Sequence, residues 1–357
     1  MPTQKRIARA AAGRVARPSA APVVPAPPAP KKPPILFDQT QKIIARVQQR
    51  LGATFIAYWN SVRGSICHND VVVHNQMLRK ARPNEKLMVF MKSDGGNGEA
   101  SLRMVNVVRT YFKQVVALVP LNCESAATMF VLGADEIHMG PMAFLSAVDT
   151  SIRHDLSPID KDNDRVSVGA NELTRILAQW KTRSTDADPN PFAELYKYIH
   201  PLVIGAVDRS DSLSVKLCEE ILSFHMRDGE NIKRIAHALN NDFPSHGYPI
   251  LLREAQRLGL NASPLDRELE HDLMALNECY SEMGQLCRTD YDERHHHVNE
   301  IINITEIEGA MVFYVVDKDW HWRESDRTWV YTNEQSKWRS REIGDGGKIV
   351  DDELHIR

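Results

Sequence analysis

The sequence lacks an apolar run of the roughly 20 residues that a helix needs to cross a bilayer. Its longest apolar runs, at residues 115–120 and 310–316, have the length of a β-strand. Cysteine is scarce: the 357 residues contain five cysteines, which are scattered along the chain and odd in number. This pattern is typical of a reducing compartment rather than of a disulfide framework. We therefore expect no membrane span and a location in the cytoplasm.

Metal and cofactor motifs are also missing. The histidine run His295, His296 and His297 lies near Cys279 and Cys287, but the spacing matches no zinc pattern. We interpret the run as a solvated surface feature. No Gly-Lys-Ser or Gly-Lys-Thr follows the glycine-rich turn, which argues against a phosphate-binding loop. The sequence therefore predicts no metal site and no cofactor.

Acidic residues are absent from residues 1–34, which contain seven Lys or Arg and many Pro and Ala. The whole chain has a net charge of −3, so this basic arm leaves −10 on the remainder. Such an acidic body argues against nucleic acid as a partner. The proline density predicts a disordered, extended arm. The alternative is an organelle transit peptide, which would place the protein in an organelle matrix.

Strand-sized apolar runs alternate with segments of helical period in the middle of the chain. Strands are predicted at 86–91, 115–120, 136–139 and 143–148, and helices at 99–112 and 125–132. This alternation indicates βαβ units around a parallel sheet. Helices follow up to residue 260, including one or two long ones within 192–222 that carry an apolar stripe.

The composition changes after residue 265, where one amphipathic helix is followed by an alternating, tryptophan-rich tail. We therefore predict three parts along the chain. They are a disordered arm at 1–34, an α/β domain at 35–265, and a small C-terminal α+β extension at 266–357. The extension carries aromatic and basic residues side by side, and we interpret these as packing or subunit contacts.

Two of the predicted strands end in a short polar turn that opens a helix. The first turn reads SDGGNG at 93–98, and the second reads NCESAA at 122–127. Backbone N–H groups in such turns can hold an oxyanion, and a serine at a helix start can act as a nucleophile. Ser125 is the candidate nucleophile, and Gly95, Gly96 and Ala126 are the candidate oxyanion donors. A serine that merely caps its helix and an ordinary Gly-Gly turn are the alternatives.

Four stretches, at 88–98, 119–128, 133–141 and 245–260, together resemble the serine dehydrogenase proteinase family. That family is close to the signal peptide peptidases within the ClpP/crotonase fold. The resemblance covers about half of the chain and implies stacked βαβ units with flanking helices. It also implies a homo-oligomer with its interface or lid within 192–222. The implied activity is a serine peptidase that hydrolyses unfolded or extended polypeptides through an acyl-enzyme on Ser125.

The general base does not lie in this central stretch, because residues 143–151 contain no histidine. The candidates are His246, then Lys181, then Lys161, with Asp149 as the group that would orient His246 in a triad. The alternative for His246 is a turn histidine bonded to backbone. Two other functions stay open, namely a catalytically inactive ClpP-like oligomeric scaffold and a crotonase-like enzyme acting on acyl-CoA.

Overall fold

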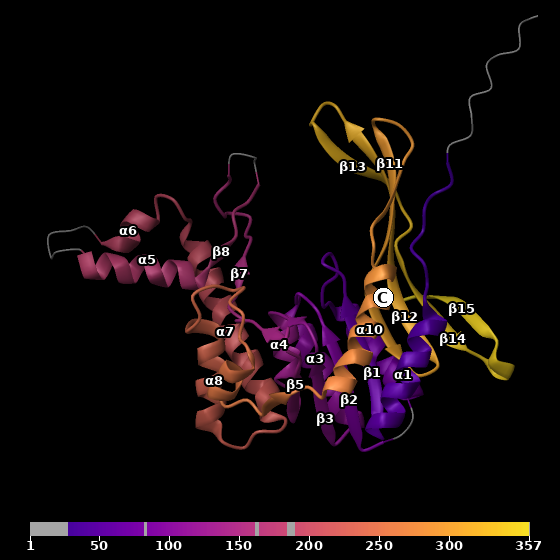
Figure 1. Ribbon diagram of the computed structural model, residues 1–357. Coiled ribbons are helices and arrows are strands. Elements are labelled where there is room, and N and C mark those ends of the chain that lie inside the picture. The colour runs from indigo at the N-terminus through magenta and orange to yellow at the C-terminus, as the bar shows by residue number, and fades with distance from the viewer. Residues whose placement is uncertain (1–27, 82–83, 161–163, 184–189, 357) are drawn as a thin grey trace, which may run out of the picture.

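The protein is described from a computed structural model, which covers residues 28–81, 84–160, 164–183 and 190–356. Most of the predicted arm and the candidate base Lys161 lie outside these residues. The fold is mixed α/β, with an eleven-stranded sheet and helices on both of its faces (Figure 1). Within the described ranges, no helix combines the length and the apolar character that a membrane span requires.

Five strands of the large sheet run parallel in the order β1-β2-β3-β5-β9. Their bounds are β1 (Thr54–Asn60), β2 (Lys86–Lys92), β3 (Gln114–Val119), β5 (Glu136–Met139) and β9 (Ala262–Pro264). Strands covered on both faces are largely apolar, which is why the sequence predicted the strands at 86–91 and 115–120. The predicted strand at 136–139 instead alternates, with Ile137 and Met139 buried. The fourth predicted strand, 143–148, shrinks to β6 (Phe144–Leu145), which pairs with β4 (Asn122–Cys123) in a separate small sheet.

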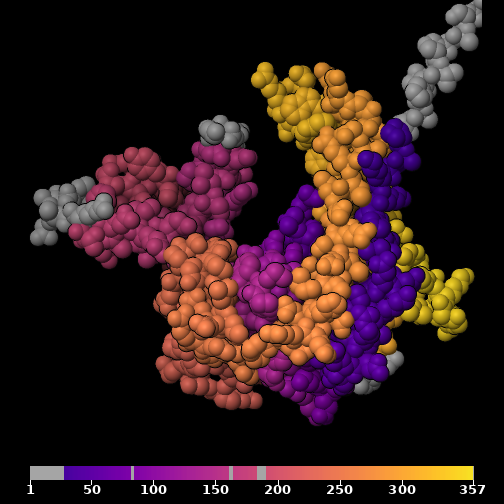
Figure 2. Space-filling view, viewed as in Figure 1, coloured from indigo at the N-terminus to yellow at the C-terminus, as the bar shows by residue number. Residues whose placement is uncertain are grey.

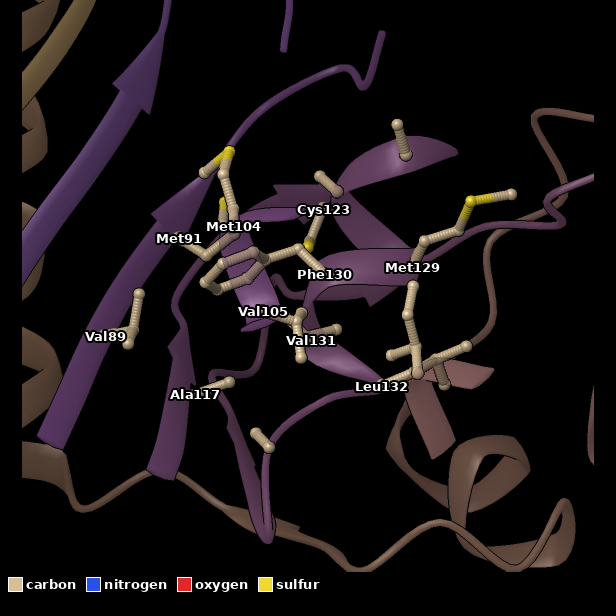
Figure 3. Close-up of a cluster of buried hydrophobic side chains, with 14 of the residues drawn as sticks. Val89, Met91, Met104, Val105, Ala117, Cys123, Met129, Phe130, Val131 and Leu132 are labelled. Atoms are coloured by element: carbon tan, nitrogen blue, oxygen red, sulfur yellow. The ribbon is translucent and has the colours of Figure 1, made fainter. Parts of the chain in front are cut away.

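Helices cover both faces of the sheet. Those of the described residues are α1 (Phe37–Leu51), α2 (His68–Lys80), α3 (Gly98–Tyr111), α4 (Ala126–Val131), α5 (Ala170–Arg183), α6 (Pro191–Leu195), α7 (Pro201–Ser223), α8 (Gly229–Asn241), α9 (Leu252–Arg257) and α10 (Arg267–Met283). Alternate residues of β2 belong to different cores, because strand side chains point to opposite faces. Val89 and Met91 pack with Met104 and Phe130 of α3 and α4 (Figure 3), whereas Phe90 packs with residues of α1 and α10.

Residues 266–357 contribute to the same sheet. Strand β11 (His295–Ile307) pairs antiparallel with β1 on one side and with β12 (Ala310–Arg323) on the other. The strands β14 (Lys337–Ile343) and β15 (Ile349–Leu354) complete this edge. The far ends of β11 and β12 join β10 (Cys287–Asp290) and β13 (Thr328–Glu334) in a distal ribbon that projects from the body (Figures 1 and 2).

The histidine run lies in this distal ribbon. His296 and His297 are only 7% and 5% exposed, so the prediction of a solvated run is wrong for both. His296 packs against the rings of Trp320 and Trp329, and the Nδ1 atom of His297 lies 2.9 Å from Asp319 Oδ1. No group of three or more His, Cys, Asp or Glu side chains suited to a metal occurs in the described residues.

Part of the segment between β6 and β9 forms a second projection, which carries α5, α6, the start of α7 and the pair β7 (Ser151–Ile152) and β8 (Val168–Gly169) (Figure 1). The predicted apolar stripe within 192–222 is divided there. Val203 and Val207 of α7 are buried against Val168 and Leu173. Leu202 is instead 63% exposed.

A buried carboxyl group joins the C-terminal strand β11 to helices α1 and α10. Glu306 has no exposed surface, and it accepts hydrogen bonds from Thr40 Oγ1 at 2.6 Å, Gln41 Nε2 at 2.7 Å and the Tyr280 hydroxyl at 2.7 Å. Burial raises the pKa of Glu306 to about 7, although these three hydrogen bonds oppose the shift. The protonated form is therefore the form that the fold favours.

We expect Glu306 to make stability depend on pH. Its folded pKa exceeds the unfolded value, so its contribution is full below the unfolded pKa and is lost as pH rises to about 7. Relative to Glu306→Gln, the free energy of unfolding of the wild type should fall by about 3 kcal/mol over that range. Urea denaturation at a series of pH values measures this difference. Glu278→Gln, an exposed change on α10, should run parallel to the wild type. Parallel curves for Glu306→Gln would contradict the expectation.

Candidate active site

Ser125 occupies the turn between β4 and α4 in a strained conformation. Its φ is 52° and its ψ is −119°, although it is not glycine. Such a backbone costs about 1–3 kcal/mol and persists where the surroundings impose it. Here the N–H of Ser125 donates to Ser146 Oγ at 2.7 Å, and the N–H of Ser146 donates to Thr128 Oγ1 at 3.0 Å. The turn is thus held from the segment that follows β5.

The hydroxyl group of Ser125 makes no hydrogen bond within the described residues. The side chain of this N-cap residue accepts no hydrogen bond from its helix, so Ser125 does not cap α4 in the usual way. No hydrogen bond joins Ser125 Oγ to any residue that the structure describes. Ser125 lines a cavity of about 240 Å³ together with Gly96, Ala126, Met129 and Leu217.

The glycine-rich turn after β2 lies against Ser125. Gly95 and Gly96 have φ values of 102° and 143°, a region that favours glycine. A Cβ atom added to Gly95 would lie 2.7 Å from Ser125 Cβ and 3.2 Å from Ala126 N. The N–H of Ser93 also donates to Asn122 O at 3.2 Å, and the N–H of Glu124 donates to Ser93 O at 3.0 Å. The structure therefore brings the two predicted turns together.

The N–H groups of the three predicted oxyanion donors differ in their hydrogen bonds. The N–H of Gly95 donates to Ser93 Oγ at 3.1 Å, so this predicted donor is already occupied. Gly95 O accepts a hydrogen bond from the N–H of Ile66 at 2.8 Å. The C=O and N–H of a trans peptide point in opposite directions, so the N–H of Gly96 faces away from Ile66. Among the described residues, no hydrogen bond occupies the N–H of Gly96 or that of Ala126. Both residues line the cavity of Ser125.

His246 lies in the turn between α8 and α9, and its Nδ1 atom is 2.9 Å from Asp149 Oδ1. Asn171 Nδ2 donates to the other oxygen of Asp149 at 3.1 Å. The Nε2 atom of His246 has no hydrogen-bond partner in the described ranges. His246 and Ser125 are not joined by a hydrogen bond there. His246 does interact electrostatically with Glu124, the residue before Ser125.

The hydrogen bond between Asp149 and His246 shifts the pKa of both side chains. The hydrogen bond with Asp149 is the largest cause and raises the pKa of His246, while partial burial opposes the shift. Burial alone would raise the pKa of Asp149, but the hydrogen bonds from His246 and Asn171 outweigh it and lower that pKa. Asp149 is therefore ionised at neutral pH, and His246 is a stronger base than an isolated imidazole.

The other candidate bases are placed differently. Lys181 is an exposed residue in the last part of α5, and the far end of that helix points away from α4 in Figure 1. Lys161 lies outside the described residues. Of the two candidates that the structure describes, His246 is the one that is hydrogen-bonded to a carboxylate.

Several residues of the site were not predicted. Ser146 and Asn171 hold Ser125 and Asp149 through single hydrogen bonds, and Glu124 contributes charge near His246. Ile66 uses its backbone groups on the glycine turn. A local signal existed only for Glu124, which is the immediate neighbour of the predicted nucleophile. The others are joined to the site by packing between distant segments.

No family model matches the chain, and the search of curated proteins returned no match. Among solved structures, a serine-to-alanine variant of the 1510-N membrane-bound stomatin-specific protease is 14% identical, with 66% of this chain and 88% of that chain covered and a TM-score of 0.36. A lysine-to-alanine variant of that protease in complex with a substrate peptide gives 14% identity, 60% and 78% coverage, and a TM-score of 0.36. A ClpP1 variant from Listeria monocytogenes is 13% identical, with 63% of this chain and 99% of that chain covered and a TM-score of 0.32. Similarity at this level carries no argument about the site.

Proposed function

We propose that the protein is a serine peptidase with Ser125 as nucleophile, His246 as general base and Asp149 as the residue that orients His246. The observation that carries this proposal is the Asp149–His246 hydrogen bond, which fixes Nδ1 and leaves Nε2 free to accept a proton. An unbonded serine on a strained turn at a helix start supplies the matching nucleophile. The reaction class is acyl transfer to Ser125 followed by hydrolysis.

The steps follow from these atoms. Ser125 Oγ attacks the carbonyl carbon of the scissile peptide while His246 Nε2 takes the hydroxyl proton. The N–H groups of Gly96 and Ala126, in the turn opened by Gly95, hold the oxyanion of the tetrahedral intermediate. His246 then gives the proton to the leaving amine, and the acyl-enzyme remains. Water, deprotonated by His246, attacks the ester carbon. The bond from that carbon to Ser125 Oγ then breaks, His246 returns the proton to Ser125 Oγ, and the acid is released. The Ser125–His246 contact forms with substrate, because catalytic hydrogen bonds often tighten only in the complex.

The proposed arrangement is that of the ClpP/crotonase fold, with βαβ units formed by β1, β2, β3 and β5 and the helices between them. The parallel order of these strands supports it, and so does the small β4–β6 pair beside the nucleophile. The proposed substrates are unfolded or extended polypeptides, because the Ser125 cavity opens at the surface between α3, α4 and α7.

A homo-oligomer is part of the proposal. The segment that leads into α7 exposes large apolar side chains, which on a monomer would meet water. More than one third of the residue surface is exposed at each of four positions, Phe192, Tyr196, Tyr198 and Leu202. Contact between copies through this segment would cover them.

A fluorophosphonate probe tests the nucleophile, because it forms a covalent bond with an activated serine. We expect the wild type to be labelled at Ser125, as located by mass spectrometry of the digest. Ser125→Ala should not be labelled. Ser210→Ala removes a different serine from the same cavity and should be labelled like the wild type. Labelling of Ser125→Ala at the wild-type level would refute the assignment. A folded wild type that takes no label would favour the inactive scaffold.

A further inference from the structure

We infer that Asn303 and Asp70 are positioning residues for the oxyanion loop, defined as residues 93–97, and that they act through the loop at 61–67. This inference rests on the proposed function. It assigns a catalytic contribution to β11, a strand that follows the nucleophile by about 170 residues and carries no residue of the proposed triad. The hydrogen bonds of Asn303 and Asp70 within the described residues do not include Ser125.

The oxyanion loop is held on its outer side by one residue. Ile66 N donates to Gly95 O at 2.8 Å, and Asn97 N donates to Ile66 O at 2.9 Å. The contact is close, since a Cβ atom on Gly96 would lie 2.4 Å from Ile66 O. The N–H and the C=O of Ile66 are thus both hydrogen-bonded to this loop. The first of these hydrogen bonds is the one that turns the N–H of Gly96 away from Ile66.

Ile66 is in turn fixed through the residues on either side of it. Asn303 Nδ2 donates to Ser65 O at 2.9 Å, and Asp70 Oδ2 accepts from Cys67 N at 2.7 Å. Asn303 Nδ2 also lies 3.1 Å from Asp70 Oδ1, which joins the two holders to each other. Both side chains are buried, with exposures of 4% for Asn303 and 0% for Asp70. A buried network of this kind permits one arrangement of the backbone that it holds.

The end of the 61–67 loop next to β1 rests on an irregularity of β11. The register of β11 with β12 shifts between Ile301 and Asn303, which leaves Ile302 as a bulge. The N–H of Ser61 donates to Ile302 O at 2.9 Å. Gly64 lies so close that an added Cβ atom would be 2.1 Å from Ile302 O. Bulges of this type re-aim backbone and side chains near functional sites.

The chain of contacts therefore runs from β11 through Ile66 to the peptide between Gly95 and Gly96. Loss of the Asn303 amide would leave Ser65 O without its donor and free the 61–67 loop to shift. A rotated Gly95–Gly96 peptide would no longer present its N–H beside Ser125. Such an N–H acts on the oxyanion of the transition state, so its misplacement lowers kcat and leaves KM for a short substrate unchanged.

The test compares Asn303→Leu with Asn299→Leu on a short peptide ester. Asn299 is a matched control, because it is 3% exposed on the same strand and donates to Asp317 Oδ2 at 3.2 Å, in the distal ribbon. We expect Asn303→Leu to lower kcat about 10- to 100-fold with KM unchanged, since a displacement of about 1 Å can have that effect. Asn299→Leu should keep the kcat of the wild type. Equal kcat values for the two folded variants would overturn the inference.

Two further measurements separate the possible failures. If Asn303→Leu does not fold, Asp70→Asn replaces it, and a wild-type kcat in folded Asp70→Asn overturns the inference. Amide hydrogen exchange at Ile66 should be faster in either folded variant, and unchanged protection there would also overturn it. Turnover that is independent of Ser125 would refute the proposed function itself. Turnover that depends on Ser125 but is insensitive to Asn303 and Asp70 would refute the positioning role alone.

Discussion

Asp149→Asn is expected to lower kcat about 10⁴-fold while the protein keeps its fold. The carboxylate accepts the Nδ1–H of His246 and thereby leaves Nε2 as the proton acceptor. An asparagine amide can donate to Nδ1 instead, which stabilises the tautomer that carries its proton on Nε2. That tautomer cannot take the proton of Ser125. Steady-state kinetics on an unfolded protein substrate and on a peptide ester measure the loss.

The pH profile gives a second measure of the same change. In the wild type the hydrogen bond with Asp149 raises the pKa of His246, and the imidazole must be neutral to act as a base. The acid limb of kcat/KM should therefore lie above the ordinary histidine pKa of about 6.5. In Asp149→Asn the limb should move to lower pH. Asp242→Asn, an exposed change near the same turn, should leave rate and profile unchanged. An acid limb that stays in place in Asp149→Asn would argue against His246 as the base.

Gly95→Ala should lower kcat by about 10²–10³-fold, the loss expected when an oxyanion donor is displaced. The new Cβ atom would lie 2.7 Å from Ser125 Cβ and 2.8 Å from Glu124 O, so either the glycine turn or the serine turn must move. The φ of 102° adds backbone strain of about 1–3 kcal/mol. Kinetics on the peptide ester, together with urea denaturation, separate the catalytic loss from the loss of stability.

Gly309→Ala is the matched control for this change. Gly309 also has a positive φ, of 86°, but a Cβ atom there would meet nothing within 4 Å. Gly309→Ala should lose stability through backbone strain but keep the kcat of the wild type. Wild-type kcat in a folded Gly95→Ala would show that the oxyanion is bound elsewhere.

Local pattern predicted the elements of the centre well. The strands at 86–91 and 115–120 and the helix between them could be predicted because buried parallel strands are largely apolar and amphipathic helices repeat every 3.6 residues. The two turns around Gly95 and Ser125 could be predicted for a similar reason, since glycines in a turn and a serine at a helix start are local sequence signals. Their contact with each other follows from the adjacency of β2 and β3.

Pairings between distant segments could not be predicted in the same way. The bond between Asp149 and His246 joins residues 97 positions apart, and the sequence offered His246 only as one of three candidate bases. The pairing of β1 with β11 spans the whole domain. Burial of His296 depends on Trp329, which reaches it through the pairing of β13 with β12. A run of three histidines does not by itself indicate that a distant tryptophan packs against it.

The position of β11 beside β1 also determines the order in which the protein can be completed during translation. Strand β1 begins at Thr54, but its second neighbour begins at His295. Until the ribosome has made that strand, one edge of β1 exposes unpaired N–H and C=O groups. Domains are generally built from the N-terminus as the chain emerges, at about 5–20 residues per second. The 61–67 loop therefore lacks Asn303 and the Ile302 bulge for about 10–35 s after the nucleophile turn has emerged.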